Sequence, residues 1–148
     1  MSDINEIVDI FEFLDDWDAR YQYLMELGEH LPPMADELKT EENWVRPCMS
    51  RVHVAAQSVE DDPVLIRFVG DCDTAIIKGV LALLIDLLSD RPLREIQDMD
   101  VDELFKRLQL EEHLSPSRHV GIYAIVEKMI ERATALSDLQ PQVGQKTG

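Results

Sequence analysis

The segment from Ile76 to Leu88 is the most apolar stretch of the chain, and it limits the possible folds more than any other feature. Its apolar residues cover nearly the whole circumference of a helix, interrupted by Lys78 and Asp86. A helix that is apolar on all sides must be covered by other elements. The segment is also too short to cross a bilayer. The sequence therefore predicts a buried central helix from Asp73 to about Leu88.

Apolar residues at helical spacing predict further helices on both sides of this segment. Their starts carry capping residues or a proline suited to the first turn. The expected helices cover residues 4–14, a segment that begins after Asp15-Asp16 and ends before Pro32, residues 92–98, residues 100–108, and a last helix that starts at Ser115-Pro116.

The middle of the chain carries strand signals. Apolar residues alternate from Val52 to Ala56, a turn follows at residues 60–63, and Val64 to Val69 is rich in β-branched residues. This pattern predicts an antiparallel hairpin. Helices that surround a small antiparallel sheet give an α+β fold. We expect one domain over residues 1–136 and a disordered tail over residues 137–148.

The formal net charge of −16 argues against binding to nucleic acid or to an anionic membrane, because both depend on Lys and Arg. The N-terminus lacks the basic start and apolar run of a signal peptide. Two cysteines, Cys48 and Cys72, are too few for a secreted disulfide scaffold, although one bridge between them stays possible. These features predict a cytoplasmic protein.

Cys48 lies in one of the few cationic stretches of this acidic chain. No Asp or Glu occurs from Asn43 to Val59, whereas Arg46, Arg51 and His53 flank the cysteine. Nearby positive charge favours the thiolate, which is the nucleophilic form. Cys72 lies between two aspartates, whose charges raise the pKa of its thiol. Of the two cysteines, Cys48 is thus the candidate for a reactive thiol, and the common alternative of a buried structural cysteine stays open.

The sequence supports no complete catalytic set around Cys48. A cysteine hydrolase needs a base, and nothing places His53, His113 or His119 beside the thiol. The dithiol motif Cys-x-x-Cys is absent. A zinc site built from Cys48, His53, Cys72 and His119 lacks ligand-pair spacing. A lone thiol without a base is better suited to carrying a group than to hydrolysing one.

Four ordered motifs resemble the SufE family of sulfur acceptors for cysteine desulfurases. They are the opening "LDDWDARYQYLMELGEHLPP", then "CMSRV", "GDCDTAIIKG" and "HLSPSR", and the resemblance covers roughly residues 5 to 135. It implies the SufE/IscU-like α+β fold, a curved antiparallel sheet covered by helices. It also implies that Cys48 accepts a persulfide sulfur from a SufS-type desulfurase, and that the protein stimulates this desulfurase and delivers the sulfur for iron–sulfur cluster assembly.

The same resemblance implies the partners and the supporting residues. Pyridoxal phosphate belongs to the desulfurase, so the chain itself is expected to hold no cofactor and no metal, and to show no independent turnover. A scaffold such as a SufBCD complex would receive the sulfur. Asp73 and Arg118 match family positions near the cysteine loop, as loop-positioning or partner-contact residues. Arg46 and Arg51 are suited to stabilising a persulfide anion. The oligomeric state, monomer or homodimer, stays open.

Three residues depart from the family pattern. Pro47 stands where glycine usually precedes the cysteine, His53 stands where tryptophan usually follows it, and Cys72 replaces a serine. Proline stiffens the segment, and the histidine removes a large apolar anchor under the loop. Two alternative functions therefore stay open: a carrier for another sulfur pathway, such as tRNA thiolation or molybdenum-cofactor sulfuration, and a stand-alone thiol enzyme or redox sensor that uses Cys48 and Cys72.

Overall fold

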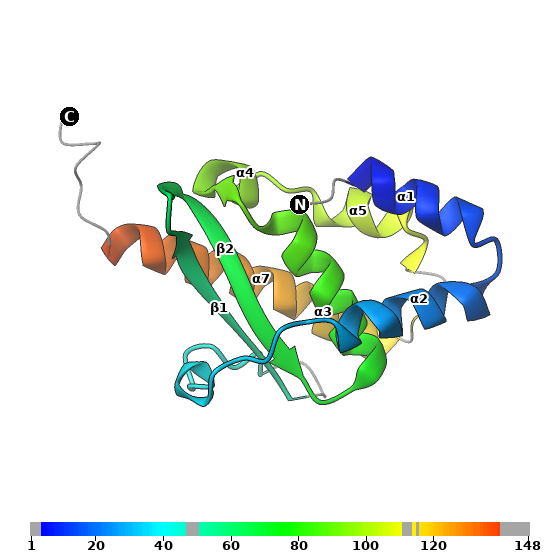
Figure 1. Ribbon diagram of the computed structural model, residues 1–148, viewed down its shortest axis with the longest axis horizontal. Coiled ribbons are helices and arrows are strands. Elements are labelled where there is room, and N and C mark those ends of the chain that lie inside the picture. The colour runs from blue at the N-terminus through cyan, green and yellow to red at the C-terminus, as the bar shows by residue number, and fades with distance from the viewer. Residues whose placement is uncertain (1–3, 47–50, 111–113, 115, 140–148) are drawn as a thin grey trace.

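The computed structural model describes residues 4–46, 51–110, 114 and 116–139, without the side chains of residues 117, 118 and 139. A β-hairpin lies across the central helix and the long C-terminal helix, and the remaining helices lie around the central helix (Figure 1). None of the helices in the described part of the chain combines the length and the hydrophobicity that a membrane span requires.

Strands β1 (Val52–Val59) and β2 (Asp62–Cys72) form the predicted antiparallel hairpin. A short strand β3 (Arg91–Pro92) pairs with β2 at Leu65 and Ile66, which gives the order β1-β2-β3. Alternate side chains, among them Val52, Val54, Ile66 and Phe68, are buried on one face of the sheet. This face packs against α3 and α7, as the period-2 pattern of the strands requires.

Helix α3 (Ala75–Leu88) is the buried central helix. Helix α2 (Trp17–Glu29) crosses it so closely that a Cβ atom on Gly28 would lie 3.0 Å from the backbone nitrogen of Gly79. Asp16 caps α2 through its carboxylate, which accepts the backbone N–H of Ala19 at 2.8 Å. The two glycines allow the backbones to approach, and this contact positions the start of α3 beneath the end of the sheet.

The remaining helices complete the core around α3. Their bounds are α1 (Ile4–Phe13), α4 (Leu93–Gln97), α5 (Val101–Arg107) and α7 (Pro116–Leu139), and a 3₁₀ turn, η1, covers Asp36–Leu38. The side chain of Arg20 ties α1 to α2, because its Nε donates to the carbonyl oxygens of Phe11 and Leu14 at 2.7 Å. The α+β class is confirmed, with helices on one face of an antiparallel sheet.

Three element boundaries differ from the sequence-based expectation. Strand β2 continues through Gly70 to Cys72, because these residues pair with the start of β1 instead of capping a helix. Helix α3 therefore begins two residues later than expected, with Thr74 at its N-cap. Helix α7 continues to Leu139 and so covers the first three residues of the predicted tail.

Candidate functional site around the Cys48 segment

The chain on both sides of residues 47–50 is anchored to the sheet. Before this segment, Val45 donates its backbone N–H to the carbonyl oxygen of Val52 at 2.9 Å. After it, Arg51 donates its backbone N–H to the Asp73 carboxylate at 2.9 Å, and Asp73 returns a backbone N–H to Arg51 at 3.3 Å. The two ends are thus fixed next to each other. Pro47 and Cys48 lie outside the described residues.

A cavity of about 560 Å³ opens beside these anchored ends. It collects residues from three parts of the chain: the loop before β1, the start of β1 and the end of β2. Its lining consists of Lys39, Thr40, Glu41, Trp44, Arg51, His53, Asp71 and Asp73. The pairing of His53 with Asp71 across the two strands explains why residues distant in sequence meet here.

The rings of Trp44 and His53 lie nearly parallel in this cavity, with centroids 6.2 Å apart and an interplanar angle of 29°. The pKa of His53 lies below its ordinary value of 6.5, chiefly because the ring is partly buried and next because Lys39 and Arg51 are close. The nearby Asp71 carboxylate opposes this shift without cancelling it. The imidazole is therefore held in its neutral form at neutral pH.

Asp71 connects three elements through two lysines. Its carboxylate lies 3.2 Å from Nζ of Lys39 and 3.5 Å from Nζ of Lys78 on α3. Burial alone would raise the pKa of Asp71. Hydrogen bonds from Lys39 and from the backbone of Cys72, together with the charge of Lys78, outweigh burial and hold the pKa below its ordinary value. Asp71 therefore stays ionised and fixes the loop at Lys39 against the sheet.

The two arginines that flank the cysteine in sequence do not share one cavity. Arg51 lines the cavity described above. Arg46 forms an ion pair with Glu41, and its guanidinium lies 4.6 Å from the centre of the Trp44 ring. It lines a separate hollow, together with Lys128 and other residues of α7. The tryptophan ring thus lies against the neutral His53 ring in one cavity and the Arg46 guanidinium in the other.

The cavity is less cationic than the sequence around Cys48 indicates. Lys39 and Arg51 face three carboxylates, from Glu41, Asp71 and Asp73, which the fold brings in from outside the Asn43–Val59 stretch. Since His53 is neutral, the lining has no excess of positive charge. The local sequence argument for a cationic setting of Cys48 therefore does not extend to this cavity.

The structure separates His53 from Cys72. His53 faces the cavity, whereas Cys72 is buried on the opposite, helix-covered side, where its partner across the strands is Val52. Thr74 donates a backbone N–H to the Cys72 sulfur at 3.4 Å. A zinc site that includes both residues is thus not supported. A buried sulfur is also poorly placed to resolve an oxidised thiol.

Sequence similarity to known proteins shows the family to which this chain belongs. The family model described as the SufE Fe–S metabolism associated domain matches residues 5–133. An uncharacterised SufE-like protein of Rhizobium etli is 37% identical over 134 residues, which is 90% of each chain. A second such protein, from Rhizobium meliloti, is 35% identical over 135 residues, covering 90% of this chain and 96% of its own. This chain belongs to the SufE family.

A solved structure agrees on the fold. The solution structure of a hypothetical protein from Thermus thermophilus aligns with a TM-score of 0.74, over 91% of this chain and 96% of that one, at 20% identity. The described α+β architecture is therefore that of a known fold. The family's description associates SufE domains with Fe–S metabolism, which indicates a role in sulfur transfer.

Within this SufE chain, the sequence-based site residues have different outcomes. Arg51, His53 and Asp73 meet in the cavity, and Arg46 lies on the other side of Trp44. Arg118 lies in the first turn of α7, and its side chain is outside what the structure describes. The ring nitrogen Nε2 of His119 is buried and has no hydrogen-bond partner among the described residues. His113 falls outside those residues.

Sequence reasoning missed Lys39, Trp44 and the role of Asp71 in this SufE site. His53 stands where the family usually has a tryptophan, and its presence was expected to remove an apolar anchor. Trp44 places another aromatic ring against His53 at this position. A tryptophan in an otherwise polar loop is a usable signal for such a contact. The position of Lys39 has no comparable signal, because its ion pair depends on the strand register that places Asp71.

Proposed function

We propose that this SufE-family protein accepts a sulfane sulfur on Cys48 from a SufS-type cysteine desulfurase and delivers it for iron–sulfur cluster assembly. The observation that carries the proposal is the family match over residues 5–133, which contains Cys48 in its "CMSRV" motif. The other cysteine, Cys72, is buried on the helix-covered side of the sheet. Of the two, Cys48 is therefore the candidate carrier.

The transfer step is a thiol–disulfide type exchange. The Cys48 thiolate attacks the outer sulfur of the desulfurase persulfide. A new sulfur–sulfur bond forms on Cys48, the bond within the desulfurase persulfide breaks, and the desulfurase cysteine leaves as a thiolate. The proton of the persulfide stays with the sulfur that moves. No oxidant or reductant is consumed, so the acceptor needs neither a cofactor nor a base of its own.

The described residues supply a frame for this step. Val52 and Asp73 hold the described chain on the two sides of the cysteine segment, at Val45 and at Arg51. Arg51, three residues after Cys48 in the sequence, lines the neighbouring cavity. Lys39 and Arg51 line this cavity and carry N–H groups that can donate to an anionic sulfur.

The test is sulfur loading measured by intact mass. The protein is incubated with a SufS-type desulfurase, its pyridoxal phosphate and cysteine, and then analysed without reductant. We expect the wild type and Cys72→Ala to gain the mass of one sulfur atom that dithiothreitol removes. Cys48→Ser should gain none and should not stimulate the release of alanine by the desulfurase. Equal sulfur gain by Cys48→Ser and the wild type would contradict the proposal.

A further inference from the structure

Three residues form one row across the end of the sheet, in the lining of the 560 Å³ cavity. Trp44 forms an isolated antiparallel bridge with His53, and His53 pairs with Asp71 across β1 and β2. Directly opposite residues of antiparallel strands point to the same face, with Cβ atoms about 5 Å apart. The imidazole of His53 therefore lies between the indole ring on one side and the Asp71 carboxylate on the other.

The Asp71 carboxylate at the end of this row binds two lysines from different elements. Lys78 belongs to α3, and its Nζ lies 3.5 Å from the carboxylate. Lys39 belongs to the loop before β1, and its Nζ lies 3.2 Å from the same group. Lys39 also pairs with Asp36, within the loop itself, at 3.7 Å. The Lys39–Asp71 contact is thus an ion pair that ties this loop to the sheet.

His53 faces charged groups from each element around the cavity. They are Lys39 and Glu41 from the loop, Arg51 from β1, and Asp71 and Asp73 from the end of β2. Glu41 is paired with Arg46, and Asp73 accepts a backbone N–H. The carboxylate directly opposite His53 across the strands is Asp71. A proton on His53 therefore adds a third cation to this lining, next to Asp71.

His53 and Lys39 oppose each other's charge. Partial burial is the largest cause of the low pKa of His53, and the charge of Lys39 is the next. Coupling between two sites is reciprocal, so protonation of His53 disfavours the position of Lys39 to the same extent. The Asp71 carboxylate favours the protonated ring. As pH falls, the imidazolium thus gains Asp71 as a partner and repels Lys39 from it.

We propose that protonation of His53 releases Lys39 from Asp71 and thereby loosens the loop at residues 36–42, while Lys78 stays on Asp71. The tie is complete above the titration range of His53 and weakens as pH falls through that range. Residues of this loop line one side of the cavity, so its shape becomes dependent on pH. The proposal requires neither sulfur transfer nor a desulfurase, and failure of one proposal leaves the other intact.

The exposure of the ion pair limits the expected effect. The side chains of Lys39 and Asp71 are 33% and 32% exposed. The loss of a partly exposed pair changes an opening equilibrium about twofold to fivefold. We therefore expect a change in local protection of the loop, without unfolding of the sheet on which it lies.

The test measures hydrogen exchange in the full-length, ¹⁵N-labelled protein, from about pH 7.5 down to the pH at which the ring signals show His53 protonated. Asn43 donates its backbone N–H to Thr40 and its side-chain N–H to Leu38, so both groups report on the loop. After correction for intrinsic exchange, their protection should fall about twofold to fivefold with the midpoint of the His53 titration. The Val54 amide, bonded to the Asn43 carbonyl at 2.8 Å, should keep its protection.

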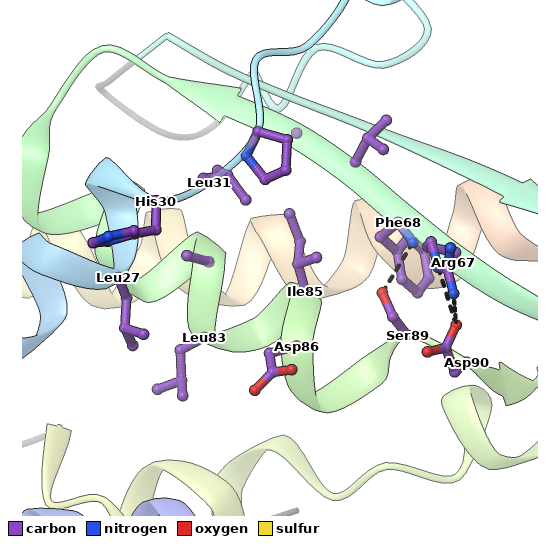
Figure 2. A pocket seen from close by; sticks show the side chains of 14 residues that line it. Leu27, His30, Leu31, Arg67, Phe68, Leu83, Ile85, Asp86, Ser89 and Asp90 are labelled. Carbon is purple, nitrogen blue, oxygen red and sulfur yellow. Dashed lines mark hydrogen bonds and ion pairs between the residues drawn. The ribbon is translucent and has the colours of Figure 1, made fainter. Parts of the chain in front are cut away.

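Three variants complete the test. His53→Gln carries a neutral side chain at every pH, and its loop protection should no longer follow the wild-type titration. His30→Gln is the matched control, because His30 lies at the C-cap of α2 and lines a separate cavity of about 440 Å³ (Figure 2). It should retain the wild-type pH dependence. Lys39→Met removes the tie and should show low loop protection at both ends of the pH range.

Any of four results would overturn the proposal. They are a His53 ring that does not titrate in the folded protein, wild-type loop protection that stays constant while the ring titrates, the same pH dependence in His53→Gln, and wild-type protection of the loop in Lys39→Met at pH 7.5. No desulfurase or sulfur donor is present in these experiments, so their outcome is separate from that of the sulfur-loading test on Cys48.

Discussion

At the residue scale, His53 combines partial burial with two neighbouring cations, and both lower its pKa. We expect an NMR titration to give His53 a pKa below 6.5. Lys39→Met should raise the pKa of His53 for two reasons. It removes a cation that lowers this pKa, and it removes one of the two lysines that offset the charge of the Asp71 carboxylate, which raises it. Lys106→Met, on the exposed side of α5, is the matched control and should leave the pKa of His53 unchanged.

The lowered pKa of His53 also affects stability. As pH falls below about 6.5, the unfolded chain binds a proton at this residue before the folded protein does. The contribution to the free energy of unfolding is therefore complete above 6.5, declines as pH falls to the folded-state pKa, and stays constant below it. In urea unfolding at pH 7.5 and 5.5, His53→Gln should lose less stability on acidification than the wild type. An equal loss in both proteins would contradict this prediction.

Asp73 anchors the returning end of the cysteine segment through the backbone N–H of Arg51. Asp73→Ala removes the acceptor and should speed hydrogen exchange of the Arg51 amide roughly fivefold, which corresponds to about 1 kcal/mol for one hydrogen bond. Asp73→Asn keeps a side-chain oxygen at the same position and should show a smaller change. Unchanged exchange in Asp73→Ala would show that the carboxylate does not hold this end.

At the element scale, the crossing of α2 and α3 depends on Gly79. A Cβ atom at this position would overlap the carbonyl group of Leu24, and backbone atoms have little freedom to move. Alanine in a helix normally gains about 1 kcal/mol over glycine. Here we expect overpacking to outweigh this gain, so Gly79→Ala should lower the free energy of unfolding by about 2 kcal/mol.

Gly28→Ala provides the graded comparison for this prediction. Its Cβ atom would lie 3.0 Å from the nitrogen of Gly79, which is a tight contact but not an overlap. Chemical denaturation should therefore show a smaller loss for Gly28→Ala than for Gly79→Ala. If Gly79→Ala were more stable than the wild type, the gain in helix propensity would exceed any overpacking. This result would contradict the close crossing of α2 and α3 at Gly79.

Elements with strong local signals were predictable from the sequence, and those that depend on pairing were not. The all-round apolar pattern indicated α3, and Asp16 and Asp100 capped the helices they precede. The end of β2 was misread as a helix cap, because Gly70-Asp71-Cys72 has turn-like composition and its pairing with residues 52–54 has no local signature. The same register creates the cavity, so Arg51, His53 and Asp73 were recognised from motif position rather than from their contacts.

At the scale of the whole molecule, charge repulsion opposes folding. The chain has 30 acidic and 14 basic residues, and the resulting net charge is concentrated when the chain becomes compact. Described ion pairs such as Lys39–Asp71 and Arg67–Asp90 act in the other direction. Each partly exposed pair of this kind contributes under about 1 kcal/mol. The excess of like charge is therefore expected to be the larger effect.

Salt distinguishes charge repulsion from ion pairing because screening repulsion stabilises the fold, whereas screening ion pairs destabilises it. Raising the ionic strength from 0.01 to 0.15 M shortens the Debye length from about 30 Å to about 8 Å. At pH 7, where repulsion dominates, the thermal midpoint should rise by a few degrees. Near pH 4.4, the calculated isoelectric point, the net charge vanishes and the same salt should no longer stabilise the fold. A midpoint that falls with salt at pH 7 would mean that ion pairs, such as the one that fixes Lys39 to Asp71, outweigh the excess of like charge.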